Sequence, residues 1–428
     1  MNYNKGFYDF IEIGTSDFDT LIQTVCPYTK GISLDPIQTY LNNLPSPPNV
    51  LKLPLAISDQ DGETELYYIP EETIKEYNLK WWVRGSNSIG KPHSFTLKDI
   101  GKEMYEKLVK IKKIPTLNLS TLFSKYQVNK IRYFKIDTEG HDHVILKEYL
   151  KLCKSNPSLL ADIIHFEYHP EVSNTKILNE LIPEFKGYKI EKNLNKSEIK
   201  LYRPQIPRII HQTFKTKNLP KDIQSSVNQL KLQNPSFEYR FYDDEDCIKF
   251  IQDYYPKKVL DLYFKIPNKF TSARADLFRY LLMYKIGGVY LDIKSSTTTP
   301  LKNTLIDTDE YLLTHWPGKD WAEEIGNSLG EFQNWHIICR PFHPFLAKTI
   351  EDVLNNLETK TISNKFDILR TTGPIAYSKA ISELTKYPTH QSTSINSSVR
   401  EYLLEHEIGL KYINLLQHHK HYYNSYNE

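Results

Sequence analysis

Cysteine, long apolar runs and net charge are all scarce in this chain, and each shortage excludes a class of protein. Its 428 residues hold four cysteines, none in a C-x-x-C pair, which excludes a zinc ribbon and predicts reduced thiols instead of a disulfide framework. No apolar run approaches the roughly 18 residues that span a membrane. The amino terminus lacks the basic and then apolar pattern of a secretory signal, so we expect a cytosolic protein.

Positive and negative charges are nearly balanced, with 54 Lys and Arg against 52 Asp and Glu and a net charge of +2. A protein that neutralises nucleic-acid phosphates needs a basic surplus or a strongly basic face. We therefore expect no nucleic-acid partner. Apolar residues make up 40% and charged residues 25%, which is typical of a soluble folded protein. No feature of the sequence indicates an oligomeric state.

Length and proline placement predict two α/β domains. A chain of this length is expected to form two or three domains. Pro204 and Pro207 interrupt the chain just after an apolar stretch, so we expect domains at 1–203 and 206–428. Short apolar stretches alternate with helical ones in both halves, which predicts mostly parallel sheets.

The apolar stretches predict where the strands and helices lie. Seven strands are expected in the first half, at 9–13, 31–34, 51–57, 131–136, 162–167, 188–190 and 199–202, with a helix entered near Phe18 and another at 175–181. In the second half, strands are expected at 208–210, 239–242 and 288–293, and helices near 221–232, 244–254 and 271–284.

Acidic residues and a glycine stand at the ends of the first predicted strands. Glu12 and Gly14 close the first strand, and Asp35 closes the second, 21 residues after Gly14. That spacing is near the one at which an acid binds the ribose hydroxyls in a nucleotide-binding βαβ unit. Asp59 follows the third strand. Each segment alone also suits an ordinary capped turn without a ligand.

The fourth predicted strand ends in K-I-D-T-E-G-H, over residues 135–141. Together with E-I-G-T-S at 12–16, A-I-S-D at 56–59 and G-S-N-S at 85–88, this element resembles the FkbM family of S-adenosylmethionine-dependent methyltransferases. The similarity spans about residues 8–203. It implies a Rossmann-like, seven-stranded methyltransferase fold.

The FkbM resemblance also implies a cofactor site and a reaction. By position, Gly14 lies under the methionine part of S-adenosylmethionine, with Glu12 beside it, Asp35 binds the ribose, Asp59 lies near the adenine, and Asp137 lies at the sulfonium and the acceptor. Members of the family mostly methylate hydroxyl oxygens, which calls for a general base. The candidate bases are Asp137, Glu139, His141, Glu167 and His169. Each histidine also suits a purely structural role.

A predicted helix and strand in the second half place charged residues near each other. On the helix, Asp276 and Arg279 share a face, where they can brace each other or bind one ligand. A double glycine ends the helix, and on the strand that follows, Tyr290, Asp292 and Lys294 point away from the apolar side. Taken separately, the two pieces also suit a helix salt bridge and a solvated strand end.

The order of these pieces is more specific than either piece alone. S-A-R-A-D-L-F-R-Y at 272–280, the double glycine and Y-L-D-I-K at 290–294 resemble the sugar-binding region of glycosyltransferase family 32, which carries a D-x-D motif. The resemblance implies a GT-A-like fold, a nucleotide-sugar donor and a glycan or glycoconjugate acceptor. The donor-binding residues that it implies are His211, Gln212, Arg274, Asp276, Arg279, Tyr290 and Asp292, with a looser fit through 334–345 and 372–374.

The D-x-D motif departs from the family at its last position. Asp292 implies a divalent ion, Mn or Mg, on the donor diphosphate, but Lys294 replaces the second acid. A hard cation prefers oxygen ligands, so either the metal binds more weakly or the ammonium itself supplies positive charge. His419, between His418 and His421, is a candidate to complete a manganese site, and it equally suits a solvated tail.

These residues lead to two hypotheses of different classes. In the first, the chain is a bifunctional glycan-modifying enzyme, which transfers a sugar with retention of configuration through Asp292, Arg279 and Lys294 and methylates a hydroxyl with Asp137, Glu139 or His141 as base. In the second, the altered D-I-K motif marks an inactive, carbohydrate-binding module attached to an active methyltransferase. A nucleic-acid methyltransferase is disfavoured by the charge balance.

Overall fold

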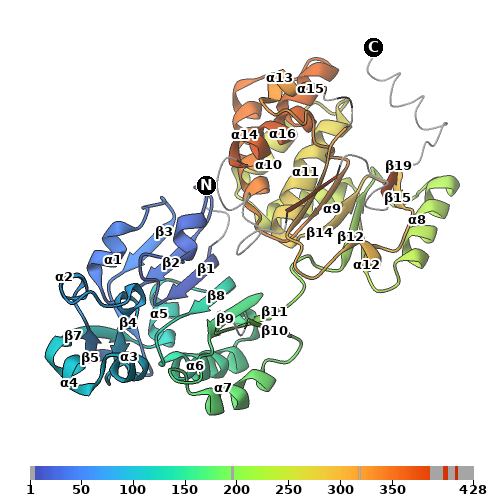
Figure 1. The fold of residues 1–428 in the computed structure, drawn as a ribbon. Helices are drawn as coiled ribbons and strands as arrows, with labels where there is room; N and C mark the ends of the chain where they lie inside the picture. The colour runs from blue at the N-terminus through green and yellow to red at the C-terminus, as the bar shows by residue number, and fades with distance from the viewer. Residues whose placement is uncertain are drawn as a thin grey trace. The chain divides into compact units, whose positions relative to one another are not determined.

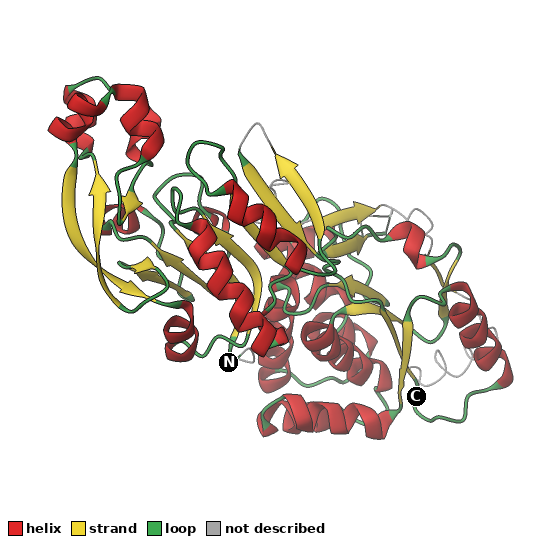
Figure 2. Ribbon diagram, turned by 90° about the horizontal axis from the view of Figure 1, so that it is seen from below, coloured by secondary structure: helices red, strands yellow, loops and turns green. Residues whose placement is uncertain are grey.

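The computed structural model describes residues 5–193, 197–316, 318, 320–385, 399–402 and 410–412. The chain divides into two compact units, of which one ends at Arg203 and the other begins at Pro204 (Figure 1). Both units combine helices with β-sheets, as the red and yellow elements in Figure 2 show. The predicted α/β class and two-unit layout are therefore confirmed.

A seven-stranded sheet forms the centre of the first unit, with the strand order β10-β11-β9-β8-β1-β2-β3. All neighbouring pairs are parallel except those of β11, which is antiparallel to both β9 and β10. The strands are β1 (Phe7–Ile13), β2 (Gly31–Leu34), β3 (Val50–Leu53), β8 (Lys130–Ile136), β9 (Ile163–Glu167), β10 (Lys189–Asn193) and β11 (Glu198–Tyr202). Every residue of β1 is buried, as expected for a central parallel strand that is covered on both faces.

The register of this sheet aligns three strand ends. Ile13 at the end of β1 pairs with Leu34 of β2 and with Ile136 of β8. The residues that follow these strands therefore emerge at the same edge, where open α/β sheets bind their ligands. Around the sheet lie α1 (Gln38–Asn43), α5 (Leu119–Lys125), α6 (Asp142–Ser155), α7 (Thr175–Leu181) and the short 3-10 turns η1 (Leu21–Thr24), η3 (Pro157–Leu159) and η4 (Ile182–Glu184).

The prediction of one strand over 51–57 is wrong. Strand β3 ends at Leu53, and Pro54, which has no amide hydrogen to donate, separates it from β4 (Ala56–Ile57). Strand β4 belongs to a second sheet, of order β4-β7-β5-β6, with β5 (Gly62–Tyr68), β6 (Ser88–Ile89) and β7 (Lys110–Leu117). The helix expected from Phe18 is also shorter, because only the turn η1 forms there. The helix predicted at 175–181 is confirmed as α7.

The second sheet carries helical segments that the sequence did not reveal. They are α2 (Glu71–Glu76), η2 (Trp81–Arg84), α3 (Ser94–Ile100) and α4 (Lys102–Leu108). Ile69, Ile74, Val83, Tyr105 and Leu108 form a small core of their own under these segments. Residues 56–117 thus form an added layer with its own packing, and it contributes to the pocket described below.

A six-stranded sheet of order β13-β12-β14-β17-β16-β18 forms the centre of the second unit. Its strands are β12 (Ile209–Thr213), β13 (Glu238–Tyr242), β14 (Gly288–Leu291), β16 (Tyr311–Thr314), β17 (His336–Cys339) and β18 (Val399–Tyr402). β17 is antiparallel to its neighbours β14 and β16, and the other pairs are parallel. A short separate ladder joins β15 (Ser295–Thr297) to β19 (Leu410–Tyr412).

Helices accompany this sheet along the chain. They are α8 (Lys221–Gln233), α9 (Asp244–Tyr254), α10 (Lys257–Lys265), α11 (Thr271–Ile286), α12 (Leu301–Thr304), α13 (Ala322–Ile325), α14 (Pro344–Thr359), α15 (Lys365–Thr371) and α16 (Pro374–Leu384). Helix α11 is buried on nearly all sides, so the polar face expected at Asp276 and Arg279 lies inside the unit.

The expected alternation along 288–293 fails at Asp292. Strand β14 ends at Leu291, and the amide of Ser295 donates to the carbonyl of Asp292 at 2.8 Å, which closes a tight turn over 292–295. Ile293 belongs to a cluster with Ile223 and Val227, whereas Leu291 belongs to another cluster. Lys294 lies in the turn, so strand alternation does not fix its direction.

Two further predictions concern compartment and thiols. In the described part of the chain, no helix combines the length and the apolar character that crossing a bilayer requires. All four cysteines are free and buried, which confirms the expectation of reduced thiols.

Candidate functional sites

A pocket partly open to solvent lies where the first unit's strand ends meet, with about 820 Å³ of space that includes some of that solvent. Residues after β1, β2 and β8 form one side of it, and residues of the added layer form another. Four of the residues predicted to bind the cofactor or act as base line it, namely Gly14, Asp35, Asp137 and Glu139. The aligned register explains this gathering, because it brings residues far apart in sequence to one edge.

Gly14 is required by the close approach of two strand ends. Its φ is +79°, and a Cβ at this position would lie 1.8 Å from the carbonyl oxygen of Asp137. The amide of Asp137 donates to the carbonyl of Ile13 at 2.9 Å, which keeps the two segments in contact. A side chain would separate β1 from β8 at the pocket floor, so glycine has a structural reason beyond any ligand.

Asp35 presents a buried carboxylate beside an apolar wall. Its oxygens accept hydrogen bonds from the amides of Ser16 at 2.9 Å and Ile37 at 2.7 Å. Burial raises the pKa of Asp35 to about 6, although the two amides act to lower it. Ser16 also lines the pocket, and its buried hydroxyl has no hydrogen-bond partner in the described structure. The apolar wall consists of Phe18, Pro36, Leu55, Ala56, Ile57, Leu66 and Ile89.

Glu12 lies outside the pocket lining, contrary to its predicted contact with the cofactor. It is fully buried, where it accepts hydrogen bonds from the hydroxyls of Thr15 and Thr20 and from the amide of Leu21. The ammonium of Lys135 lies 3.1 Å from it. Glu12 therefore holds the loop after β1 in place and balances a buried cation.

Carboxylates crowd the pocket's edge after β8. Burial raises the pKa of Asp137 well above its ordinary value, and the nearby charges of Glu139 and Asp142 add to the rise against Lys135. Burial, followed by the charges of Glu139, Asp142 and Asp137, raises the pKa of Glu167 to about 11. Asp137 and Glu167 therefore bind their protons more tightly than free carboxyl groups do.

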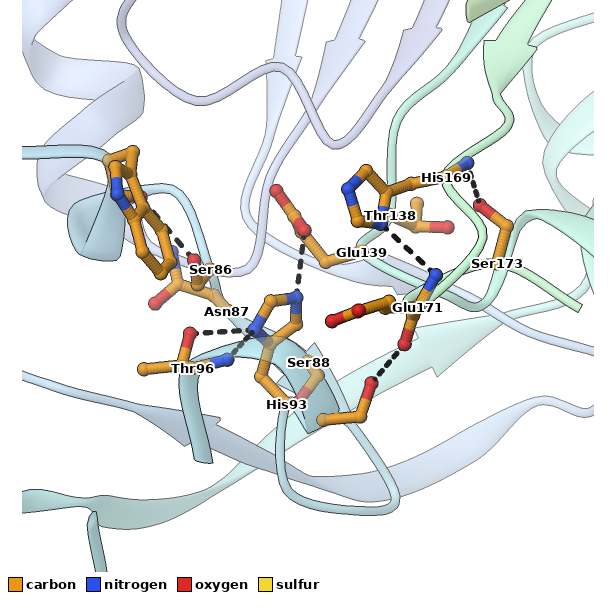
Figure 3. A network of polar contacts seen from close by, with 12 residues as sticks. Ser86, Asn87, Ser88, His93, Thr96, Thr138, Glu139, His169, Glu171 and Ser173 are labelled. Atoms are coloured by element: carbon orange, nitrogen blue, oxygen red, sulfur yellow. Dashed lines mark hydrogen bonds and ion pairs between the residues drawn. The ribbon is translucent and has the colours of Figure 1, made fainter. Parts of the chain in front are cut away.

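Glu139 is held by a histidine that the sequence motifs did not reveal. Figure 3 shows the His93 ring between Glu139 and Thr96. Nε2 of His93 lies 3.0 Å from Oε2 of Glu139, while Nδ1 accepts the amide of Thr96 at 3.2 Å. Because Nδ1 is an acceptor, a neutral ring carries its proton on Nε2 and donates it to Glu139. Glu139 itself has a φ of +52°, in the left-handed region.

Four other predicted residues do not line the pocket, namely Asp59, His141, His169 and the candidate base Glu167. His141 contacts the hydroxyl of Ser58 at 3.1 Å, and burial lowers its pKa to about 4. Asp59 is exposed and accepts the hydroxyl of Ser58 at 3.1 Å. His169 accepts the amide of Glu171 (Figure 3). Its ring centroid lies 5.4 Å from that of Phe95. These residues follow the strand ends in the sequence, yet none of them lines the pocket.

In the second unit, a buried arginine lies between two aspartates. Nη2 of Arg279 lies 3.3 Å from Oδ1 of Asp276 and 3.2 Å from Oδ1 of Asp292. The guanidinium also donates to the carbonyl of Asn334 at 2.6 Å and stacks 5.0 Å from the ring of Tyr290. The hydroxyl of Tyr290 donates to Oδ1 of Asp292 at 3.2 Å. Helix α11 and the end of β14 are thereby joined.

Burial within this group changes the titration of both acids. It raises the pKa of Asp276 to about 6, against the opposing charge of Arg279, and it raises that of Asp292 as well. Asp276 accepts further hydrogen bonds from Asn334 and from the hydroxyl of Thr372, both at 3.2 Å. Asp292 retains the greater exposure, with 27% of its side chain accessible against 8% for Asp276. Asp292 is thus the member of the pair that faces outward.

The other predicted donor-binding residues are engaged inside the fold. His211 is fully buried, with its ring nitrogens 3.2 Å from the hydroxyl of Tyr242 and 3.0 Å from the carbonyl of Gly287, and burial lowers its pKa to about 4. The Gln212 amide donates to the carbonyl of Asp292 at 3.2 Å. His211 therefore fixes the residue just before β14, and Gln212 fixes the residue just after it, so these polar atoms are used inside the fold. Arg274 donates to the carbonyl of Ile266 at 2.8 Å.

The residues present do not fit a divalent cation. Among the described residues, no three His, Cys, Asp or Glu side chains form a group that could hold a metal ion. Asp292 already shares one oxygen with Arg279 and Tyr290, and a lysine stands two residues later. Hard divalent ions take several oxygen ligands, and neighbouring cations repel them. The predicted ligand His419 lies outside the described residues.

Comparison with known families defines two classes in one chain. Residues 12–190 match the model of the methyltransferase FkbM domain, and residues 220–312 match that of the glycosyltransferase sugar-binding region containing a DXD motif. The chain therefore carries an FkbM methyltransferase domain followed by a DXD-type glycosyltransferase region, which confirms both resemblances.

Individual relatives match the glycosyltransferase class. Inositol phosphoceramide mannosyltransferase 3 of Schizosaccharomyces pombe is 30% identical over 191 residues, which cover 43% of this chain and 47% of that protein. The initiation-specific alpha-1,6-mannosyltransferase of Saccharomyces cerevisiae is 24% identical, over 35% of this chain and 39% of that protein. The chain thus spans about half the length of the curated relatives it matches.

One solved structure is a more remote match. The PaToxG glycosyltransferase is 16% identical, with a TM-score of 0.32, over 42% of this chain and 70% of that chain. A score this low does not establish a common fold.

Proposed function

We propose that the second unit transfers a hexosyl group, mannose first among the candidates, from a nucleotide-sugar donor to a hydroxyl of a glycan or glycoconjugate. The observation that carries this proposal is the buried group of Asp276, Arg279 and Asp292 at the end of β14. The mannosyltransferase names of several relatives support the choice of sugar. A GT-A-like fold and retention of configuration belong to the same proposal.

Each residue of this group has a role in the proposed transfer. Asp292, the more exposed acid, accepts hydrogen bonds from donor hydroxyls, and Arg279 stabilises the negative charge that develops on the leaving diphosphate. Asp276 holds Arg279 in position from its own helix. His211 and Gln212 act indirectly, because His211 fixes the start of β14 and Gln212 fixes Asp292 just after its end.

We further propose that the first unit methylates a hydroxyl, with S-adenosylmethionine as the methyl donor when it is bound. The pocket residues fit this molecule. Asp35 suits a ribose diol, the Ser16 hydroxyl is a buried group still in need of a partner, and Ile57, Leu66 and Ile89 offer an apolar wall for a flat base. The strand order of the seven-stranded sheet supports a Rossmann-like methyltransferase fold.

Glu139 is the proposed base for this methylation. It lines the pocket, and its contact with His93 fixes its carboxylate. Asp137 lies beside it, but burial raises its pKa, which favours the protonated form and suits Asp137 better to donate a hydrogen bond than to remove a proton. His141 is not in the lining, so we assign it no catalytic role.

The first test measures turnover of the full chain with a panel of nucleotide sugars. Wild type is expected to release nucleoside diphosphate from one donor, while Asp292→Asn loses at least about tenfold in rate with unchanged thermal stability. Lys302→Asn, an exposed change on α12, serves as the matched control. Unchanged turnover in Asp292→Asn would refute its assignment.

A second candidate function is favoured by one observation, the lysine at position 294 in place of the motif's second acid. In this alternative, the second unit binds carbohydrate without transferring it, and only the methyltransferase is active. Measurable binding of a mannose-containing glycan, together with no release of nucleoside diphosphate from any donor, would establish the alternative.

The cytosolic location expected from the sequence stays a prediction.

A further inference from the structure

We propose that sugar transfer in the second unit needs no divalent cation, because Arg279 and Lys294 supply the positive charge at the donor diphosphate. This inference rests on the proposed glycosyltransferase function and deepens it. A D-x-D motif usually binds a divalent metal ion, but this chain has Lys294 where the motif has its second acid.

Oxygen ligands for a metal are scarce at this strand end. Oδ1 of Asp292 already accepts from Tyr290 and lies against Arg279. Both oxygens of Asp276 are engaged by Asn334 and Thr372. Within the described part of the chain, this leaves Oδ2 of Asp292 as the carboxylate oxygen of the pair without a hydrogen bond. A divalent ion at a phosphate site takes about six oxygen ligands, of which the protein usually supplies one or two carboxylates and the phosphates and waters supply the rest. This strand end therefore offers at most one carboxylate oxygen, and it lies beside two cations.

The local charge favours a diphosphate over a metal ion. Asp276 and Asp292 are opposed by Arg279, whose side chain is only 5% exposed, and by Lys294, which is buried in the turn after Asp292. Two acids and two cations leave no net negative charge to attract a divalent ion. An acid at position 294 would change the local charge by two units and supply a second carboxylate. Arg279 and Lys294 thus supply the positive charge that a divalent ion would otherwise bring.

The reaction balances without a metal. The bond between the anomeric carbon and the diphosphate oxygen breaks, and its electron pair leaves with that oxygen, next to Arg279 and Lys294. The acceptor's hydroxyl oxygen forms the new bond to the anomeric carbon. Its proton passes to the departing diphosphate, so no further reactant is needed.

The test compares Lys294→Asp, which restores two acids, with the wild type and with Lys302→Asp, the same charge change on exposed α12. Release of nucleoside diphosphate is measured in EDTA and in manganese. Wild type and Lys302→Asp are expected to keep their rates in EDTA within about twofold, while Lys294→Asp falls by at least about tenfold and recovers with manganese. Lys294→Gln should lose rate in both conditions and gain no response to manganese.

A second readout separates this inference from the proposed function. Calorimetry measures binding of GDP and UDP to the same full-length proteins, with EDTA or manganese. Binding by wild type that is unchanged in EDTA supports the inference even if no donor turns over, a result that would sink the proposed function alone. Wild-type binding or turnover that disappears in EDTA and returns with manganese overturns the inference. Thermal denaturation identifies any variant that has failed to fold.

Discussion

Asp35→Asn is expected to stabilise the first unit and to weaken its proposed cofactor site at the same time. Burial raises the pKa of Asp35 from 3.8 to about 6 in the folded chain. A carboxyl group that binds its proton more tightly when folded contributes stability that is complete below the unfolded pKa and is lost as the pH rises through the folded pKa. The cost of ionising Asp35 therefore grows as the pH rises above 3.8 and is complete above about pH 6.

The magnitude follows from the same pKa change. A rise from 3.8 to about 6 corresponds to about 3 kcal/mol at neutral pH. Asparagine removes this cost but offers one acceptor oxygen where the amides of Ser16 and Ile37 now use two, which costs about 1 kcal/mol. The net gain expected is about 1–2 kcal/mol near pH 8, falling to zero or below near pH 4.

Hydrogen exchange of peptides spanning 7–13 and 31–34 measures this local stability in the full chain as a function of pH. S-adenosylmethionine affinity, measured by calorimetry, should fall at least about tenfold in Asp35→Asn, since hydrogen bonds from ribose hydroxyls to a charged carboxylate are lost. Exposed Asp59→Asn is the control and should change neither quantity. A stability difference that does not depend on pH, or unchanged affinity, would refute the reasoning.

The remaining predictions concern the base, a buried cation and a glycine. Glu139→Gln should lower methyl transfer by about 100-fold or more with little change in S-adenosylmethionine affinity; equal losses in both would contradict its role as base. His93→Gln, which keeps a donor toward Glu139, should retain more activity than His93→Ala, whose pH profile should shift; identical behaviour of the two variants would remove His93 as a positioning residue. Arg279→Met should destabilise the second unit by about 3–5 kcal/mol in chemical denaturation, because two acids lose their buried partner; a change within error would contradict the charge network. Gly14→Ala should destabilise the first unit by more than about 2 kcal/mol, and Gly101→Ala, with the same sign of φ but open space, by clearly less; equal losses would attribute the effect to φ alone.

Strand ends were the most predictable part of the first site. Gly14, Asp35 and Asp137 follow strands whose apolar patterns were clear, and parallel pairing brings such ends together whatever the loops do. His93 could not be found in this way, because it lies on the added layer, 46 residues before its partner Glu139. No local spacing encodes that contact, which depends on how a second small core packs.

The second site shows where periodicity misleads. Helical spacing correctly paired Asp276 with Arg279, but it did not reveal that α11 is buried on nearly all sides. Strand alternation predicts that Lys294 shares a face with Asp292, but a turn begins at Asp292 and ends the alternation. The sequence predicts that His211 contacts a ligand, yet its ring bonds the carbonyl of Gly287 just before β14. Buried backbone groups at the ends of strands need such partners for the stability of the fold itself.

Two separate transfer sites in one chain are the central claim, and one experiment measures both. The full chain is incubated with S-adenosylmethionine, a nucleotide-sugar panel and mannose-containing glycans, and both nucleoside diphosphate and S-adenosylhomocysteine are quantified. We predict that wild type forms both products, that Asp292→Asn loses only the first, and that Glu139→Gln loses only the second. Absence of both products from wild type, or loss of both in either variant, would contradict the account.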